Sequence, residues 1–202
     1  SPELKRLYGH LNKNCKVFPN QVLNIPPEKP LKKDSELVIG WGGSHGHMED
    51  MTEIARPLIN WINTMPNVSL HLMCSEPIWK LFDALPQNKK RWTLPGSLDD
   101  YYNFLKTIDI GFAPLKDSAF NRSRSDIKFL EYAISGIAPV MAHIEPYIES
   151  VNVGKTGLLF KNSGELIVNL NLLARDPSLA KDIVKNARQY VLFERLESEH
   201  GQ

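Results

Sequence analysis

Apolar residues along the chain follow two patterns, which are short continuous runs and longer stretches with helical spacing. The run ELVIGW at 36–41 is apolar after its first residue, as is typical of a strand buried on both faces of a parallel sheet. The stretch 48–65 predicts a helix, which Pro57 is expected to kink. Its apolar residues recur at i, i+3, i+4 spacing: Met51, Ile54, Leu58, Ile62 and Met65.

The same two patterns alternate over the rest of the chain. Further strands are expected at 68–74, 91–96, 109–115, 137–142 and 156–160, and a brief one at 15–18. Further helices are expected at 2–13, 78–85, 98–107, 126–135, 146–149, 163–175 and 178–197, with an irregular segment at 116–125. Strands separated by helices predict right-handed βαβ units, and therefore an α/β fold with a doubly wound, Rossmann-like parallel sheet of about six strands.

One stretch interrupts this rhythm. Residues 24–35, NIPPEKPLKKDS, hold three prolines and several charges, a composition that suits a linker better than a core. The main domain is therefore expected to cover 36–202, with 1–23 belonging to what precedes it. The first residues have an amphipathic pattern unlike a signal peptide, and they begin as if within a helix, so the chain is expected to be part of a longer protein.

Composition excludes several classes of protein. The formal net charge of +1 argues against a nucleic-acid-binding domain, so a bound anion must be held by local groups. Two distant cysteines make neither a disulfide framework nor a cysteine-rich zinc site and suit a reducing compartment, which indicates the cytoplasm. No apolar run is long enough to span a membrane.

Ligands of such sheets bind beyond the carboxyl ends of the strands, so the loops that follow strands are the ones to inspect. The first of them, GGSHGH, starts with Gly42 and Gly43, which permit close backbone approach and positive φ, and then enters a helix whose amides attract anions. It is either an ordinary tight turn or a phosphate contact made by these glycines, Ser44 and His45. His45 and His47 could form a zinc pair, but no third ligand is evident, and a neutral imidazole that donates an N–H to a phosphate or a sugar hydroxyl fits better.

A second anion-binding candidate is NRSRS at 121–125, which runs into the helix at 126–135. Ser125 is a natural N-cap, followed by the free amides of Asp126 and Ile127. Arginine is unfavourable at a helix start unless an anion arrives there, so Arg122 or Arg124 is expected to hold a phosphate bidentately, unless both are simply solvated.

Two further side chains of this helix complete the candidate site. Lys128 is expected on the same helix face as Arg124, and the apolar face is expected to hold Ile127, Leu130 and Ile134. Glu131 could accept two ribose hydroxyls, as acids do in dinucleotide sites, or could form a structural ion pair with Lys128.

The stretch 125–160, SDIKFLEYAISGIAPVMAHIEPYIESVNVGKTGLLF, resembles the donor-binding half of a retaining group 1 (family 4) glycosyltransferase of the GT-B type. The second half of the family's E-x₇-E signature stays in register, and its residues here are Glu131, Ala133, Gly136, Pro139 and Val140. NKNCKVFPNQV at 12–22 resembles the end of the acceptor domain, and 39–51 resembles the first strand and loop of the donor domain. The resemblance covers nearly the whole chain.

Two positions depart from the family pattern. Ser123 stands where the family has the first glutamate of the pair, which contacts the donor sugar. The usual arginine and lysine that neutralise the diphosphate are not at their usual places, where the first loop has Ser44, His45 and His47 instead, so Arg122, Arg124 and Lys128 are expected to compensate.

The resemblance implies transfer of a sugar from a nucleotide-diphosphate sugar with retention, without a metal or another cofactor. Arg124, Lys128 and His47 would act on the departing diphosphate, Glu131 would hold the ribose, and the loop around Leu94 and Gly96 would face the base. The implied partners are a glycan or lipid-linked acceptor and the protein's own N-terminal acceptor domain. The implied setting is cell-surface polysaccharide synthesis in the cytoplasm, with peripheral association at the inner face of the membrane through that preceding domain.

Two other classes of function stay open at the level of sequence. One is a catalytically inactive module of GT-B ancestry that binds a sugar nucleotide or a protein. The other is a GT-B-like epimerase, for which His45, His47 and His143 would be needed near the sugar.

Overall fold

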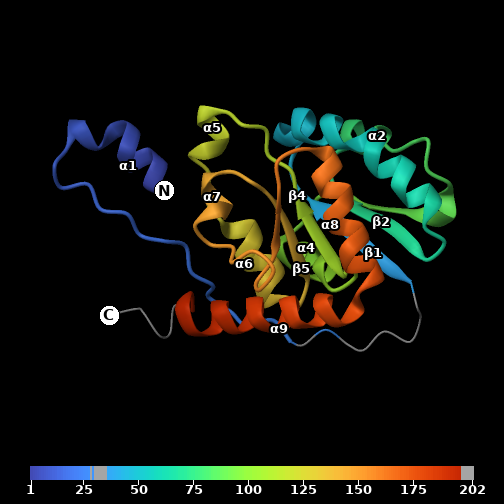
Figure 1. Ribbon diagram of the computed structural model, residues 1–202. Helices are drawn as coiled ribbons and strands as arrows, with labels where there is room; N and C mark the ends of the chain where they lie inside the picture. Colours follow the sequence, from blue (N-terminus) through green and yellow to red (C-terminus); the bar gives the residue numbers. More distant parts are fainter. Residues whose placement is uncertain (28, 30–35, 197–202) are drawn as a thin grey trace.

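A computed structural model of the protein describes residues 1–27, 29 and 36–196, and in this part of the chain six strands form one parallel sheet (Figure 1). The strand order is β3-β2-β1-β4-β5-β6, so the order reverses between β1 and β4. The strands are β1 (Leu37–Gly42), β2 (Val68–Met73), β3 (Lys90–Thr93), β4 (Ile110–Ala113), β5 (Ala138–Ala142) and β6 (Leu158–Phe160). The predicted fold class is therefore confirmed.

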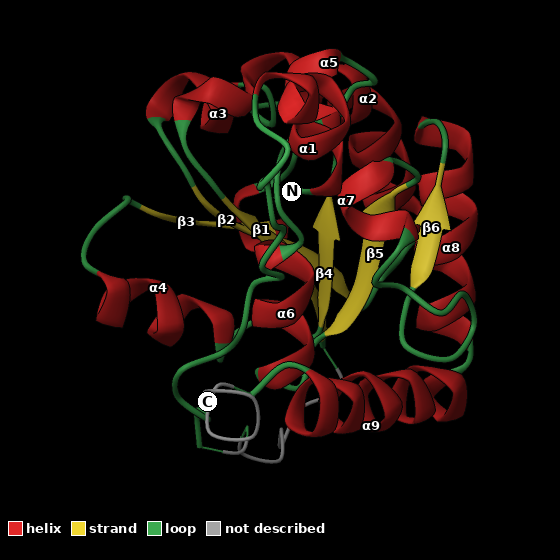
Figure 2. Cartoon of the chain, turned by 90° about the vertical axis from the view of Figure 1, so that its left-hand side faces the viewer, coloured by secondary structure: helices red, strands yellow, loops and turns green. Residues whose placement is uncertain are grey.

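Helices cover both faces of this sheet. α2 packs against α8 on one side and α6 packs against α9 on the other. Their bounds, with those of the shorter helices, are α1 (Pro2–Tyr8), α2 (Met48–Thr64), α3 (Glu76–Lys80), α4 (Leu98–Leu105), α5 (Ala119–Arg122), α6 (Ile127–Ile134), α7 (Glu145–Ile148), α8 (Ser163–Arg175) and α9 (Pro177–Glu194). The arrowheads of β4 and β6 point toward the side on which α5 and α7 lie (Figure 2), so these two short helices stand at the carboxyl edge of the sheet.

The long elements form where the sequence predicts them, because their periodicity is matched by burial. β2 is buried at every residue, and β1 at all but its first. In α2 the side chains of Met51, Ile54, Leu58 and Ile62 are at most 3% exposed. α6 ends where Gly136 takes a left-handed φ of 71°, a conformation that ends helices readily. Between α8 and α9, the Asp176 side chain accepts from the amide of Leu179 and so caps α9.

Several expected details are wrong. Residues 15–18 form no strand, because that segment runs alongside no strand of the sheet, and Phe18 is largely exposed. The segment 116–125 is not irregular throughout, since it contains α5, and the short helix expected at 78–85 begins and ends earlier, as α3. Residues 28 and 30–35 of the expected linker, and 197–202, lie outside the described residues.

One buried histidine makes the stability of the fold depend on pH. The His71 ring on β2 is 7% exposed, and its nitrogens lie 2.7 and 2.8 Å from the hydroxyls of Thr107 and Thr93. Burial, with a smaller contribution from the charge of Arg91, lowers the pKa of His71 from 6.5 to about 4. Between these pH values the His71 imidazole is protonated in the unfolded chain and neutral in the folded chain.

We therefore expect the neutral His71 ring to leave the free energy of unfolding unaffected above pH 6.5. As the pH falls from 6.5 to 4, the free energy of unfolding should decrease by about 3 kcal/mol, because the unfolded chain gains a proton there that the folded chain does not. Urea unfolding at pH 7.5, 5.5 and 4 measures this, with His71→Gln as the comparison because it lacks the titrating ring. Carboxylates titrate in both proteins, so only the difference between the two pH slopes counts. Equal slopes would contradict the prediction.

Candidate functional site

The carboxyl edge of the sheet, next to the reversal of strand order, gathers five of the predicted site residues into two hydrogen-bonded groups. We call the first the lysine cluster; it consists of Gly42, Tyr101, Lys128 and Glu131. We call the second the arginine cluster; it consists of His47, Asp50, Asn121 and Arg124. Gly42 is the last residue of β1 and His47 lies in the loop that follows it, so the two clusters adjoin through this connection.

In the lysine cluster, one ammonium group ties three elements together. Lys128 Nζ on α6 lies 2.9 Å from the carbonyl oxygen of Gly42, 2.8 Å from the Tyr101 hydroxyl and 3.4 Å from Glu131 Oε2. Burial lowers the pKa of Lys128, and the Glu131 carboxylate opposes that shift. An ammonium group has three N–H donors, so each has an acceptor within the protein. Lys128 therefore supplies charge and holds the first loop against α6.

Glu131 keeps one carboxylate oxygen available. Its Oε2 accepts from the Tyr101 hydroxyl at 2.7 Å, whereas among the described residues no donor is bonded to Oε1. Its side chain is 19% exposed. The structural ion pair with Lys128 that the sequence left open therefore exists, and it leaves one carboxylate oxygen without a donor among the described residues.

In the arginine cluster, the guanidinium of Arg124 is held at two points. Its Nε donates to Asn121 Oδ1 at 2.9 Å, and its Nη1 lies 3.3 Å from His47 Nε2, while the guanidinium carbon lies 4.9 Å from the centre of the Phe120 ring. His47 in turn lies 2.9 Å from Asp50 through Nδ1. Both ring nitrogens of His47 thus have protein partners. The imidazole therefore has no free N–H for a ligand, whereas the sequence predicts one that donates to a phosphate or a sugar hydroxyl.

The other arginine and the serines have different roles. Arg122 binds the Asp117 carboxylate through Nε and Nη2, at 2.5 and 2.7 Å, and lies 3.8 Å from Glu145. Ser123 bonds the carbonyl of Ala119 in its own short helix. Arg122 is thus engaged by carboxylates outside the two clusters, and Ser123 bonds within its own short helix.

The predicted helix start is wrong in three respects. The N-cap of α6 is Asp126, not Ser125, and its carboxylate accepts from the Ser150 hydroxyl at 2.6 Å and from Arg195 at 2.8 Å instead of capping the helix. Arg124 precedes α6 and so does not share a helix face with Lys128. Ile127 is 40% exposed and does not join the apolar face that buries Leu130 and Ile134.

The glycines of the first loop are required by packing. Among the described residues, only Gly136 and Gly154 have positive φ, so Gly42 and Gly43 do not use that freedom. A Cβ on Gly42 would lie 2.9 Å from the Tyr101 ring, and one on Gly43 2.3 Å from the Trp41 ring. Ser44 and His45 are exposed, and His45 lies 3.3 Å from the Ser75 hydroxyl, away from His47. The two histidines therefore have different partners.

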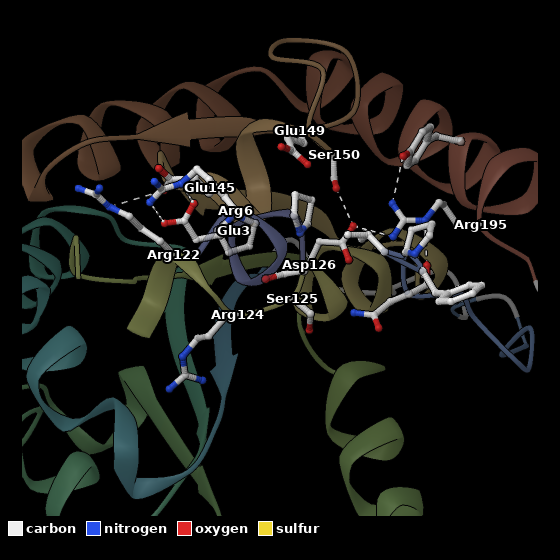
Figure 3. Close-up of a pocket in the computed structure, with 18 residues that line it drawn as sticks. Glu3, Arg6, Arg122, Arg124, Ser125, Asp126, Glu145, Glu149, Ser150 and Arg195 are labelled. Atoms are coloured by element: carbon white, nitrogen blue, oxygen red, sulfur yellow. Dashed lines mark hydrogen bonds and ion pairs between the residues drawn. The ribbon is translucent and has the colours of Figure 1, made fainter. Parts of the chain in front are cut away.

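A cavity of about 620 Å³ opens next to Arg124 of the arginine cluster, between the N-terminal segment and the starts of α6 and α7 (Figure 3). Predicted residues that line it are Arg122, Arg124, Ser125 and Asp126. The Ser1 hydroxyl donates to the carbonyl of Ser123 at 2.8 Å, which links the N-terminal segment to this edge. Figure 3 shows Arg122 among the acids Glu3 and Glu145, whereas Arg124 points away from them.

The loop expected to face a nucleotide base follows the edge strand β3. Leu94 is 65% exposed, and a Cβ on Gly96 would lie 2.5 Å from the Asp100 carboxylate, because that carboxylate folds back to cap α4. The exposed Leu94 leaves an open apolar surface at the end of this strand.

Sequence reasoning missed Tyr101 and Asp50, which hold the clusters together. Tyr101 lies within the stretch LDDYYNFL, in which nothing marks it as part of a site. Asp50 follows His47 by three residues at a helix start, a spacing that brings two side chains together and could have been noticed. Among the described residues, no group of three or more His, Cys, Asp and Glu residues gathers as a metal site would require. In the same part of the chain, no helix has the length and apolar character to cross a membrane.

Solved structures share this fold. The C-terminal domain of a group 1 family glycosyl transferase, LpcC of Francisella tularensis, matches with a TM-score of 0.64 and 17% identity over 77% of this chain and 84% of that one. Sucrose-phosphate synthase of Thermosynechococcus elongatus matches with a TM-score of 0.70 and 12% identity over 98% of this chain and 53% of that one. Anabaena HepE in complex with UDP-glucose matches with a TM-score of 0.64 and 15% identity over 96% and 49%.

The chain thus has the fold of a GT-B glycosyltransferase domain, and this fold is consistent with the C-terminal domain of such a protein. It spans about half the length of the sucrose-phosphate synthase and HepE chains. No family model and no curated protein matches the sequence.

Proposed function

We propose that the chain is the nucleotide-sugar-binding domain of a retaining glycosyltransferase, and that the two clusters hold the donor. Support comes chiefly from Arg124. Its guanidinium is fixed on one side by His47 and Asn121, and among the described residues nothing accepts from its Nη2 group. A preorganised guanidinium with free N–H groups at the carboxyl edge of such a sheet is suited to a diphosphate.

The remaining parts of the site have separate roles in this proposal. Arg124 and the amides at the start of α6 meet the charge that grows on the departing diphosphate, so the chemistry needs no metal. Lys128 adds positive charge and fixes the loop at Gly42, while the free oxygen of Glu131 accepts from the ribose. The sugar passes to a glycan or lipid-linked acceptor bound by a second domain, in polysaccharide synthesis at the cytoplasmic face of the membrane. The solved HepE structures, which contain UDP with glucose or UDP-glucose, agree with a donor of this class.

We expect calorimetric titration with UDP-glucose, GDP-mannose and dTDP-glucose to show binding of one nucleotide class. Arg124→Ala and Glu131→Gln should each weaken it about tenfold, because each removes one charge-assisted hydrogen bond. The loss in Glu131→Gln should disappear for a dideoxy nucleotide without ribose hydroxyls, because the acceptor then has no donor to bind.

Arg56→Ala and Glu53→Gln are the matched controls, since both side chains lie on the exposed face of α2. Both should bind like the wild type. If none of the three nucleotide sugars binds to the wild type, the proposed function is wrong, and the inactive-module alternative gains support.

A further inference from the structure

Asp50 is a buried carboxylate at the start of α2 that contacts both residues holding Arg124. Its side chain is 5% exposed. Oδ1 accepts from the backbone N–H of Lys116 at 2.8 Å and from Asn121 Nδ2 at 3.3 Å, and Oδ2 lies 2.9 Å from His47 Nδ1. One carboxylate therefore contacts both the imidazole and the amide from which Arg124 takes its hydrogen bonds.

These contacts decide which atoms face Arg124. A carboxylate only accepts, so His47 carries its proton on Nδ1 and turns the lone pair of Nε2 toward Arg124 Nη1. The Trp41 ring meets the imidazole edge-on at 5.4 Å and limits its rotation. Asn121 is oriented likewise, since its Nδ2 donates to Asp50 and to the carbonyl of Lys116, which leaves Oδ1 for Arg124 Nε.

We propose that Asp50 is a positioning residue of the diphosphate site, which acts through His47 and Asn121 to aim the guanidinium of Arg124. This inference rests on the proposed function, because it takes Arg124 to bind a diphosphate. It makes His47 a support for the arginine, with its proton held on the side away from the ligand.

A purely structural role of Asp50 would require fewer contacts than the structure shows. The bonds from Lys116 and Asn121 to Oδ1 already connect α2 to the loop after β4 and to α5. The network continues from Oδ2 to the imidazole of His47 and from there to the guanidinium of Arg124. These further contacts connect no additional helix or strand to α2. Each of these groups instead fixes the geometry of the next one.

Asp50→Asn tests the positioning role. Two N–H donors converge on Oδ1, so the oxygen of the new amide stays there and its NH₂ group faces His47. The imidazole then accepts through Nδ1 and carries its proton on Nε2, where it opposes the N–H of Arg124. We expect nuclear magnetic resonance of the ring nitrogens to report this reversed tautomer, and binding of the nucleotide sugar that the wild type prefers to weaken about tenfold.

Three comparisons make the test specific. Glu49→Gln removes a neighbouring, exposed carboxylate of the same helix turn and should bind like the wild type. Asp50→Asn combined with Arg124→Ala should bind no more weakly than Arg124→Ala alone, because both act on one interaction. His47→Gln, whose amide oxygen replaces Nε2 as acceptor, should keep most of the affinity that His47→Ala loses; this pair serves as the test if Asp50→Asn does not fold.

The outcomes separate the two proposals. If the wild type binds no nucleotide sugar, the proposed function fails, and the role of Asp50 fails with it. If the wild type binds and Arg124→Ala weakens binding, the positioning role alone is overturned by any one of three results: an Asp50→Asn variant that binds as tightly as the wild type, an unchanged tautomer, or additive losses in the double variant.

Discussion

Lys128→Met is expected to weaken binding of the preferred nucleotide sugar at least 100-fold, about 2.7 kcal/mol. The ammonium group is bonded to the carbonyl of Gly42, to the Tyr101 hydroxyl and to Glu131. Its removal therefore releases the first loop, leaves Glu131 without its counter-ion, and takes one positive charge from the diphosphate site. Methionine keeps most of the apolar stem, so the packing of α6 should survive.

Calorimetry measures the loss, and circular dichroism confirms that the variant is folded. Lys106→Met is the matched control, because Lys106 is exposed and, among the described residues, its ammonium group bonds Asn103 of α4 alone. Binding by Lys128→Met within a few-fold of the wild type would show that the ammonium group has no part in holding the donor.

Arg195→Met is expected to lower the free energy of unfolding by about 4 kcal/mol, because it leaves the buried Asp126 carboxylate without its counter-ion. The two side chains are 9% and 10% exposed, and their charged atoms lie 2.8 Å apart. Arg195 also donates to the carbonyl of Asn20 at 2.9 Å, so the substitution loosens the N-terminal segment as well.

Urea denaturation measures this change, and the double variant Asp126→Asn with Arg195→Met is the comparison. Since the amide carries no charge, the double variant should be more stable than Arg195→Met alone. Folded Arg195→Met should still bind the nucleotide sugar, because the structure commits Asp126 to Arg195 and Ser150 and not to the clusters. A double variant no more stable than the single one would rule out an uncompensated carboxylate as the cause.

Much of the fold could be predicted because it depends on local pattern. The helical spacing in α2 and the apolar run of β1 are determined within one element, and both predict burial that the structure shows. The order of strands and helices then leaves few topologies, since parallel βαβ connections are right-handed. The loop after β1 and the segment before α6 follow as the places for a site, because carboxyl ends of neighbouring strands meet at one edge.

The choice among neighbouring residues could not be predicted. Arg122 and Arg124 are equivalent in the sequence, but a carboxylate, Asp117, engages the first. The second is held by His47 and Asn121, and among the described residues its Nη2 has no acceptor. Ser125 and Asp126 are equally suited to an N-cap by residue type. The structure places Asp126 there, and its carboxylate pairs with Arg195, far along the chain.

The sequence by itself determined the class of fold, the edge of the sheet at which chemistry is expected, and the kinds of side chain available there, because these follow from periodicity and residue type. The tertiary structure alone decided which charges are neutralised and which N–H groups stay free. Those depend on partners such as Asp50, Tyr101 and Arg195, which folding brings to the edge from distant elements, and electrostatic and hydrogen-bond energies act over a few ångströms in space whatever the separation along the chain.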